Sequence, residues 1–165
     1  GGSARPGYHG FAYSGMSLSR GSVGMHQLEI GLTVTVTVTN TGPLHPSATP
    51  MDEVEQQHVV LLFVTDEVRT ITAETKMLKH FERVSLAPGT STTISFTIAR
   101  KQLEFFGKDL ALGPIVEPGV FTLRVGAAAD PQDCSCTGTE DRTVADGSCA
   151  TGPAELVCQQ FVVTG

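Results

Sequence analysis

Residues 27–39 alternate aliphatic and polar side chains with a period of two. Most odd positions carry Gln, Glu or Thr, and the aliphatic side chains occupy even positions: Leu28, Ile30, Leu32, Val34, Val36 and Val38. Successive side chains of a β-strand point to opposite faces, so this pattern predicts a long strand of an antiparallel sheet with one solvent-facing side. Asn40-Thr41-Gly42 then predicts a turn that ends the strand.

Other parts of the chain carry further strand signals, with turn residues between them. These ranges are residues 11–18, 59–65, 77–86, 92–98, 120–125 and 157–163. The range 59–65 is apolar almost throughout, which is typical of a strand covered on both faces. The only helical turn that we expect lies near residues 100–106. About seven strands and no long helix predict one all-β domain over residues 1–165, built as an antiparallel β-sandwich.

We expect one set of apolar side chains to fill the space between the two sheets. At 165 residues and 40% hydrophobic content, the chain is long enough to bury a sizeable core. The expected core residues are Val34, Val36, Val38, Val60, Leu62, Phe81, Ile94, Phe96, Phe121 and Leu123.

The charge of the chain and the length of its apolar runs argue against a nucleic-acid partner and a membrane span. The formal net charge is −6, and no basic run is longer than Arg100-Lys101, so we expect no nucleic-acid partner. The longest apolar run, residues 59–64, is far shorter than the roughly 18 residues that cross a bilayer. We therefore expect no membrane span.

All four cysteines, Cys134, Cys136, Cys149 and Cys158, lie near the C-terminus. Residues 130–157 are polar, and we interpret them as an insertion before the last strand. An even number of cysteines in such a stretch predicts two disulfides formed in an oxidising compartment. A four-cysteine zinc site is the alternative, but such sites favour Cys-x₂₋₄-Cys pairs, whereas this chain has Cys-x-Cys.

Two disulfide connectivities are open, because Cys134 and Cys136 are too close in sequence to pair comfortably. We favour the nested one, Cys134 with Cys158 and Cys136 with Cys149. An insertion that leaves one strand and returns to its neighbour brings its two ends together. The crossed pairing remains the alternative.

Acidic residues of the insertion could hold a calcium ion through oxygen ligands. They are Asp130, Asp133, Glu140, Asp141 and Asp146. Their spacing matches no calcium-binding loop, so we favour a solvated acidic hairpin.

Motifs for catalysis and cofactor binding are missing from the sequence. It has no His-Glu-x-x-His, no Gly-x-Ser-x-Gly, no phosphate-binding P-loop and no dinucleotide fingerprint. We assign no catalytic residue, no cofactor and no metal ligand. A carbohydrate-binding module is disfavoured because the chain has no Trp and only two Tyr. The dispersed histidines are each expected on the surface or in a loop: His9, His26, His45, His58 and His80.

The ordered series of strands resembles one known family. The matching segments are Phe11-Ala12-Tyr13-Ser14, LTVTVTVTNTG (32–42), HVVLLFVTD (58–66), MLKHFERVSLAPGTSTTISFTI (77–98) and VEPGVFTLRVG (116–126). This series resembles the fibronectin type III-like domain at the C-terminus of glycoside hydrolase family 3 enzymes, the β-glucosidases and β-xylosidases. The chain departs from the family pattern at residues 52–57, at Lys79-His80, where the family has Lys-Gly, and in the Cys-rich insertion.

The resemblance implies an immunoglobulin- or fibronectin type III-like sandwich with a Cys-rich insertion before the last strand. It also implies a non-catalytic accessory domain of a secreted glycosidase, which packs on the catalytic domains, stabilises them and contributes to the shape of the substrate cleft. In that family the catalytic Asp and Glu lie in upstream domains, so the chain alone is expected to hydrolyse nothing. We expect it to be a piece of a longer polypeptide. An extracellular structural or protein-interaction module that reuses the same sandwich is the alternative.

Overall fold

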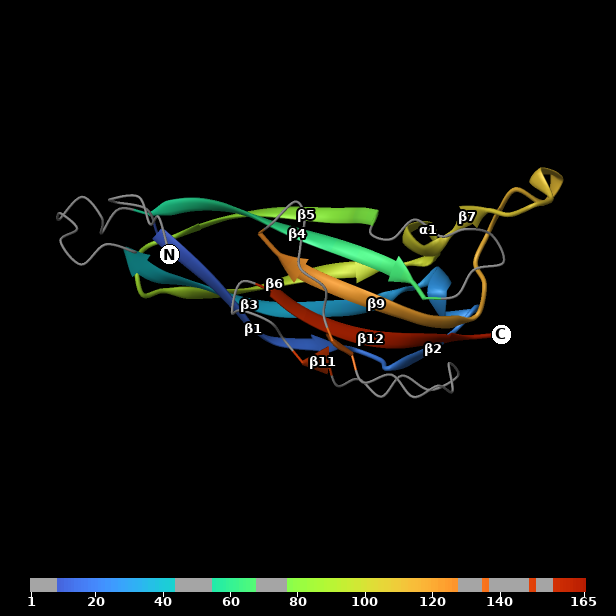
Figure 1. Cartoon of the computed structure of the whole chain (residues 1–165), viewed down its shortest axis with the longest axis horizontal. Coiled ribbons are helices and arrows are strands. Elements are labelled where there is room, and N and C mark those ends of the chain that lie inside the picture. The colour runs from blue at the N-terminus through green and yellow to red at the C-terminus, as the bar shows by residue number, and fades with distance from the viewer. Residues whose placement is uncertain (1–8, 44–54, 68–76, 128–134, 137–148, 151–155) are drawn as a thin grey trace.

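The computed structural model describes residues 9–43, 55–67, 77–127, 135–136, 149–150 and 156–165 (Figure 1). Strands dominate these ranges. They are β1 (His9–Leu18), β2 (Ser22–Gly24), β3 (Leu32–Pro43), β4 (Gln56–Asp66), β5 (Met77–Leu86), β6 (Ser91–Ile98), β7 (Phe105–Phe106), β8 (Pro114–Ile115), β9 (Gly119–Gly126), β10 (Ser135–Cys136), β11 (Cys149–Ala150) and β12 (Leu156–Thr164). The helical turns are η1 (Gln27–Glu29), α1 (Arg100–Leu103) and η3 (Leu110–Leu112).

Two sheets form the body of the domain. One is three-stranded with the order β1-β3-β6, and the other is five-stranded with the order β2-β12-β9-β4-β5. All neighbours in these sheets pair antiparallel except β2, which pairs parallel with β12. Two small ladders, β7–β8 and β10–β11, stand apart from the two sheets. Each of the seven ranges expected from the sequence contains a strand, and the short strands β2, β7, β8, β10 and β11 are additions to them.

The apolar core lies between the two sheets, as in a β-sandwich. The even positions of β3, from Leu32 to Val38, are fully buried, and they meet residues of β4, β9 and β12 in one cluster. At its centre the rings of Phe121 and Phe161 stack with their centroids 5.4 Å apart. Nine of the ten expected core residues are buried. Phe81 is the exception, because it is 61% exposed.

The strand expected at residues 27–39 begins only at Leu32. Residues Gln27–Glu29 form a 3₁₀ turn that buries Leu28, and Ile30 is 84% exposed, so the expectation was wrong for Ile30. Gly31 separates the two segments with a φ of +94°, which favours glycine. A Cβ at Gly31 would also lie 2.9 Å from the Ile98 carbonyl oxygen. The alternation alone did not reveal this break.

The turn expected at Asn40-Thr41-Gly42 is also wrong, because β3 continues to Pro43. Asn40 is fully buried, and its amide Nδ2 donates a hydrogen bond to the Leu86 carbonyl oxygen on β5 (2.9 Å). Its side-chain oxygen accepts from the Gly42 backbone N–H (2.9 Å). The Asn40 main chain pairs with Thr90 and Gly89, in the turn between β5 and β6. Asn40 therefore ties the two sheets together at this end of the sandwich.

The outer face of the five-stranded sheet differs along its length. In the second half of β4 residues of both faces are buried, and the same holds for β9 and β12. In the first half of β4, however, Val59 is 41% exposed. The expectation of a strand covered on both faces holds only for the C-terminal part of β4.

None of the helices in the described ranges has the length and apolar character to cross a membrane.

Candidate interaction surface

The described residues contain no group of three or more His, Cys, Asp or Glu side chains that could hold a metal ion. The acidic residues of the insertion, from Asp130 to Asp146, lie outside the described residues, so the calcium alternative stays open. His45 and the side chain of His9 lie outside them as well. His26 is exposed beside η1.

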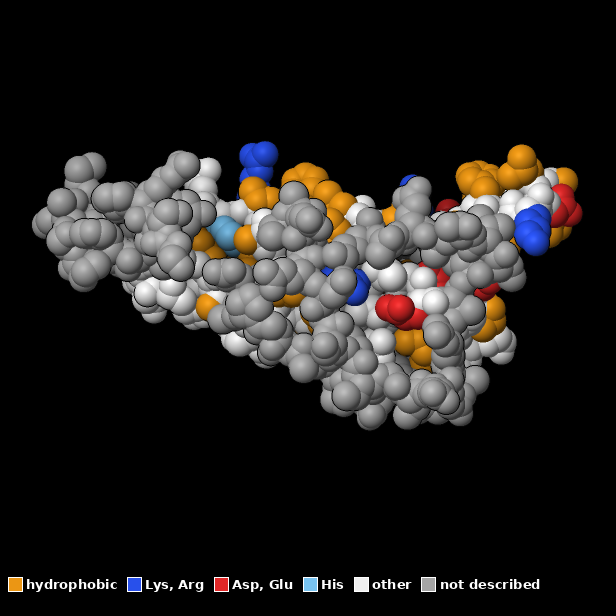
Figure 2. Space-filling view, in the orientation of Figure 1, with side chains coloured by type: hydrophobic (Ala, Val, Ile, Leu, Met, Phe, Trp, Pro, Cys, Tyr) orange, Lys and Arg blue, Asp and Glu red, His pale blue; other side chains and the backbone are white. Residues whose placement is uncertain are grey.

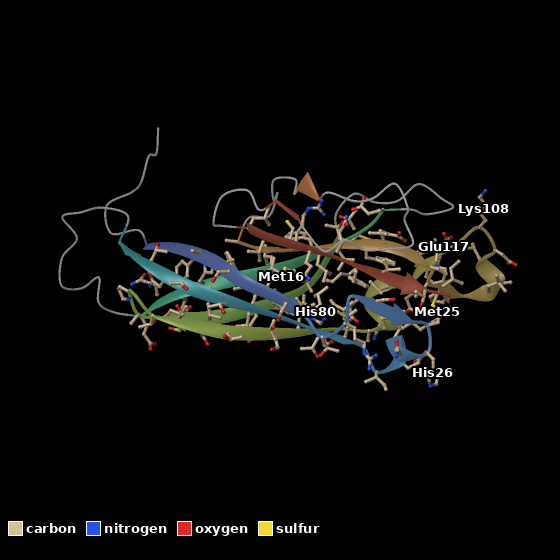
Figure 3. All side chains as sticks on the ribbon, turned by 90° about the horizontal axis from the view of Figure 1, so that it is seen from below. Met16, Met25, His26, His80, Lys108 and Glu117 are labelled. Carbon is tan, nitrogen blue, oxygen red and sulfur yellow. The ribbon has the colours of Figure 1, made fainter. Side chains whose placement is uncertain are left out.

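Of the histidines whose side chains the structure describes, His58 and His80 lie within strands. His80, on β5, is half-buried (labelled in Figure 3). Its Nε2 lies 3.1 Å from the Thr97 carbonyl oxygen, and its ring is tilted against that of Phe96. His80 stands where the family has glycine, yet no described residue other than glycine has a positive φ. The departure at Lys79-His80 therefore needs no special backbone conformation.

His58, on β4, belongs to an aromatic cluster that joins the two sheets. Its ring stacks on Phe11, with centroids 3.9 Å apart and planes 2° from parallel, and its Nε2 shares a hydrogen bond of 2.5 Å with the Tyr13 hydroxyl. Phe11 and Tyr13 both belong to β1. Burial lowers the pKa of His58 and raises the pKa of Tyr13. Both shifts favour neutral side chains, so the cluster is suited to holding the sheets together.

A second polar group lies on the outer face of β4, β9 and β12. Arg124 Nη1 donates to Thr65 Oγ1 (2.8 Å), and Gln160 Nε2 donates to Thr122 Oγ1 (3.2 Å). Thr122 in turn donates to the Glu67 carboxylate (2.5 Å). All of these residues except Glu67 are buried. The hydrogen bonds connect neighbouring strands, so the arrangement stabilises the sheet.

Apolar side chains are exposed on the outer face of β4 and β5. In the ladder, Leu61 lies opposite Phe81, Phe63 lies opposite Leu78, and Val59 lies opposite Arg83. Directly opposite residues share a face. We call Val59, Leu61, Leu78 and Phe81 the β4–β5 patch; three of them are 41%, 52% and 61% exposed, in the order Val59, Leu78 and Phe81. Figure 2 shows apolar atoms gathered over these strands.

The exposure of Phe81 could have been read from the spacing of its strand. Val84 and Leu86 are buried at even positions of β5. A period of two places an odd-numbered residue such as Phe81 on the opposite face. Its size suggested the core, but the phase of the strand decides its face.

Residues 105–115 form a separate projection, which we call the arm. It contains β7, η3 and β8, and it extends from the end of the sandwich at the upper right of Figure 1. Phe106, Leu110 and Leu112 are 59%, 71% and 68% exposed. Lys108 points away from the body of the domain at the outer end of the arm (Figure 3). The sequence had predicted only a helical turn near residues 100–106, of which α1 is the observed part.

Of the four cysteine side chains, the structure describes only that of Cys158. Cys158 on β12 is buried and is not a free cysteine. Cys134 and the side chains of Cys136 and Cys149 lie outside the described residues. The backbone ladder of β10 and β11 places Cys136 opposite Cys149. The two-disulfide pattern and its connectivity stay predictions.

Comparison with known proteins identifies the domain. Residues 58–129 match the family described as the fibronectin type III-like domain. A β-xylosidase of Formosa agariphila is 38% identical over 101 residues, which are 61% of this chain and 12% of that protein. A periplasmic β-glucosidase of Salmonella typhimurium is 29% identical over 119 residues, which are 72% of this chain and 14% of that protein. A β-glucosidase of Listeria innocua, solved with gluconolactone, has the same fold, with a TM-score of 0.65 at 21% identity over 97% of this chain and 17% of its own.

The chain thus spans only 12% and 14% of the length of these two curated relatives. The family match begins at His58 and runs through β5, β6 and the arm to beyond the end of β9, so it contains the β4–β5 patch and the arm. The chain carries a fibronectin type III-like domain of the kind found in β-xylosidases and β-glucosidases, consistent with the C-terminal domain of glycoside hydrolase family 3 enzymes.

Proposed function

We propose that this chain is a non-catalytic accessory domain of a glycoside hydrolase, and that it packs on the catalytic domains of its parent polypeptide through the β4–β5 patch. The observation that carries the proposal is the exposure of Phe81 and Leu78. Both lie in residues 77–98, one of the segments that match the family pattern, yet the sandwich does not bury them. A contiguous exposed apolar patch on a globular domain typically marks an interaction site.

The energetic reason for docking is the removal of this apolar surface from water. Fully burying one large aliphatic or aromatic side chain is worth about 1.5–3 kcal/mol. The exposed part of Phe81 and Leu78 together is therefore enough to stabilise an arrangement of two domains in one polypeptide, where the second domain is held nearby. In this proposal hydrolysis takes place in other domains, and this domain stabilises them and borders the substrate cleft.

We also propose an extracytoplasmic location, with the parent secreted or in a periplasm. One relative is named a periplasmic β-glucosidase, and another, from Dictyostelium discoideum, is named a lysosomal β-glucosidase. Cys158 is not a free cysteine. Paired cysteines persist in oxidising compartments, which supports the same location.

The proposal is tested by the double substitution Leu78→Thr with Phe81→Thr, since threonine keeps a high β-propensity. In the isolated chain we expect a change in unfolding free energy within about 0.5 kcal/mol per site, because both side chains are exposed. In the complete polypeptide we expect a lower melting temperature and a faster loss of glycosidase activity on heating. Ile30→Thr is the matched control, because Ile30 is exposed outside the patch.

Equal behaviour of the double variant and the control in the complete polypeptide would contradict docking through the patch. A complete polypeptide without any glycosidase domain would instead favour the extracellular interaction module.

A further inference from the structure

The arm presents apolar side chains that no part of the described structure covers. Phe106 on β7 and Leu110 and Leu112 on η3 are each more than half exposed. They lie on a projection of the chain and not on the face of a sheet. An isolated exposed leucine is common on protein surfaces, but three large apolar residues on one short projection are not expected of a loop that only connects strands.

The backbone of the arm is held in place by its own contacts. Phe105 pairs with Ile115, and Phe106 pairs with Pro114, in the β7–β8 ladder. At the tip, the Asp109 carboxylate accepts a hydrogen bond from the Ala111 N–H (3.0 Å). The arm is therefore ordered before it meets a partner, which lowers the entropic cost of binding.

Two glycines fit the arm to this conformation. Gly113 ends η3 with a φ of +71°, a conformation that favours glycine. Gly107 lies where a Cβ would come within 2.9 Å of Ile115 Cδ1, so a larger residue would require the end of the Ile115 side chain to move. These glycines allow a tight hairpin that places Leu110 and Leu112 at its outer end.

The position of the arm suits a partner that also covers the β4–β5 patch. Figure 1 shows β5 along the upper edge of the sandwich and the arm projecting at the upper right, and Figure 2 shows apolar atoms at both places. One large body lying along this edge can contact both. The solved β-glucosidase chain from Listeria innocua is much longer, since this fold makes up 17% of it, so the remainder of such a polypeptide is a body of sufficient size.

We propose that the arm is a second docking element, and that Phe106, Leu110 and Leu112 enter an apolar pocket on the catalytic part of the same polypeptide. This inference rests on the proposed function. Anionic lipid is a weaker occupant, because the chain has a net charge of −6 and Lys108 is followed directly by Asp109. Docking within one polypeptide gains from the high effective concentration of tethered domains, so a few apolar contacts suffice.

The first test is hydrogen exchange of the arm amides, measured in the isolated chain and in the complete polypeptide. We expect the amides of residues 105–115 to exchange at least about tenfold more slowly in the complete polypeptide, because docking suppresses local opening. Residues of η1, next to the exposed Ile30, serve as the internal control, and we expect them to exchange alike in both. Equal exchange of the arm in both proteins would overturn the inference.

The second test is the double substitution Leu110→Ser with Leu112→Ser, with Ile30→Ser as the matched control. We expect the isolated variant to melt like the isolated parent chain, which shows that it folds. In the complete polypeptide we expect arm exchange to return to the rate of the isolated chain, and activity to be lost at a lower temperature. If the arm amides of the complete polypeptide exchange equally slowly with and without the two substitutions, the inference is overturned.

Failure of the arm and failure of the proposed function give different results. If the Leu78→Thr/Phe81→Thr variant lowers the melting temperature of the complete polypeptide while the arm variant does not, the patch docks and the arm inference is wrong. If neither variant has an effect, both are wrong. Dimers of the isolated chain that the arm variant abolishes would contradict docking on the catalytic part and identify a second copy as the partner of the arm. Arm-dependent binding to phosphatidylcholine–phosphatidylserine vesicles would identify a lipid surface as the partner instead.

Discussion

The Tyr13 hydroxyl and His58 Nε2 lie 2.5 Å apart, in a hydrogen bond that joins the three-stranded sheet to the five-stranded sheet. Phe11 covers the other side of the contact by stacking on the His58 ring. A charged His58 would lose hydration in this position, which explains why burial lowers its pKa. The contact between the sheets is therefore built for a neutral histidine.

The first prediction is a loss of stability in mild acid. His58 has a lower pKa in the folded chain than its ordinary value of 6.5, so the unfolded chain binds more protons as the pH falls. The stabilising contribution is complete above about pH 6.5 and declines as the pH falls toward the lower folded pKa. Urea unfolding measured at pH values between about 8 and about 5 should show this slope. His58→Gln should flatten it, and the exposed His26→Gln is the matched control.

The second prediction contrasts two phenylalanines on neighbouring edge strands. Phe96 on β6 is buried in the core, whereas Phe81 on β5 is mostly exposed. Phe96→Ala should therefore lower the unfolding free energy of the isolated chain by about 3–5 kcal/mol, as large deletions in cores do. Phe81→Ala should change it by less than about 1 kcal/mol. Chemical denaturation of both variants measures the difference, and equal losses would contradict the assigned faces.

The third prediction concerns Asn40. Its side chain bonds Leu86 and Gly42 inside the sandwich, and Asn40→Ala would leave both backbone partners without these bonds. Unsatisfied buried polar groups cost about 1–3 kcal/mol each, so the unfolding free energy should fall by at least about 1 kcal/mol. Thr41→Ala, at the exposed neighbouring position, is the control and should have little effect. A neutral Asn40→Ala would show that water replaces these contacts.

The strands could be predicted from the sequence because apolar side chains recur with a period of two along a strand that has one buried face. Residues 91–98 show this, since Ile94, Phe96 and Ile98 are buried as the alternation requires. The prediction that Phe81 is buried was wrong because hydrophobicity alone does not decide the face; the phase of β5 does. The turn predicted at Asn40 was wrong because local turn propensity does not reveal a long-range partner such as Leu86, which is 46 residues away.

The candidate docking surfaces were harder to predict than the core. Exposure of the arm depends on how β7 pairs with β8 across the intervening turn, and a two-residue strand leaves no periodic pattern. The cluster of Phe11, Tyr13 and His58 joins residues of two strands that are not neighbours in a sheet. Such contacts follow from the stacking of the sheets, and the sequence of one strand does not contain this information.

The fourth prediction is that the purified chain of residues 1–165 hydrolyses neither aryl β-glucosides nor aryl β-xylosides. In the proposed function the catalytic carboxylates belong to other domains. The measurement is release of the chromogenic phenol, with the complete polypeptide as the positive control. Turnover above the buffer blank that persists through a second purification would contradict the accessory function.

The last prediction concerns the cysteines. If Cys134, Cys136, Cys149 and Cys158 form two disulfides, protein made in an oxidising compartment should show no free thiol by Ellman titration before reduction. Non-reducing peptide mapping should find the nested pairs. The β10–β11 ladder supports the Cys136–Cys149 pair, because directly opposite residues of an antiparallel pair lie about 4.5–5.5 Å apart at Cα, within the range of a disulfide. Reduction should leave the two sheets folded, since their core lies between β3, β4, β6 and β9. Crossed pairs would contradict the connectivity, and four free thiols or one bound zinc per chain would contradict the disulfides and the proposed oxidising compartment.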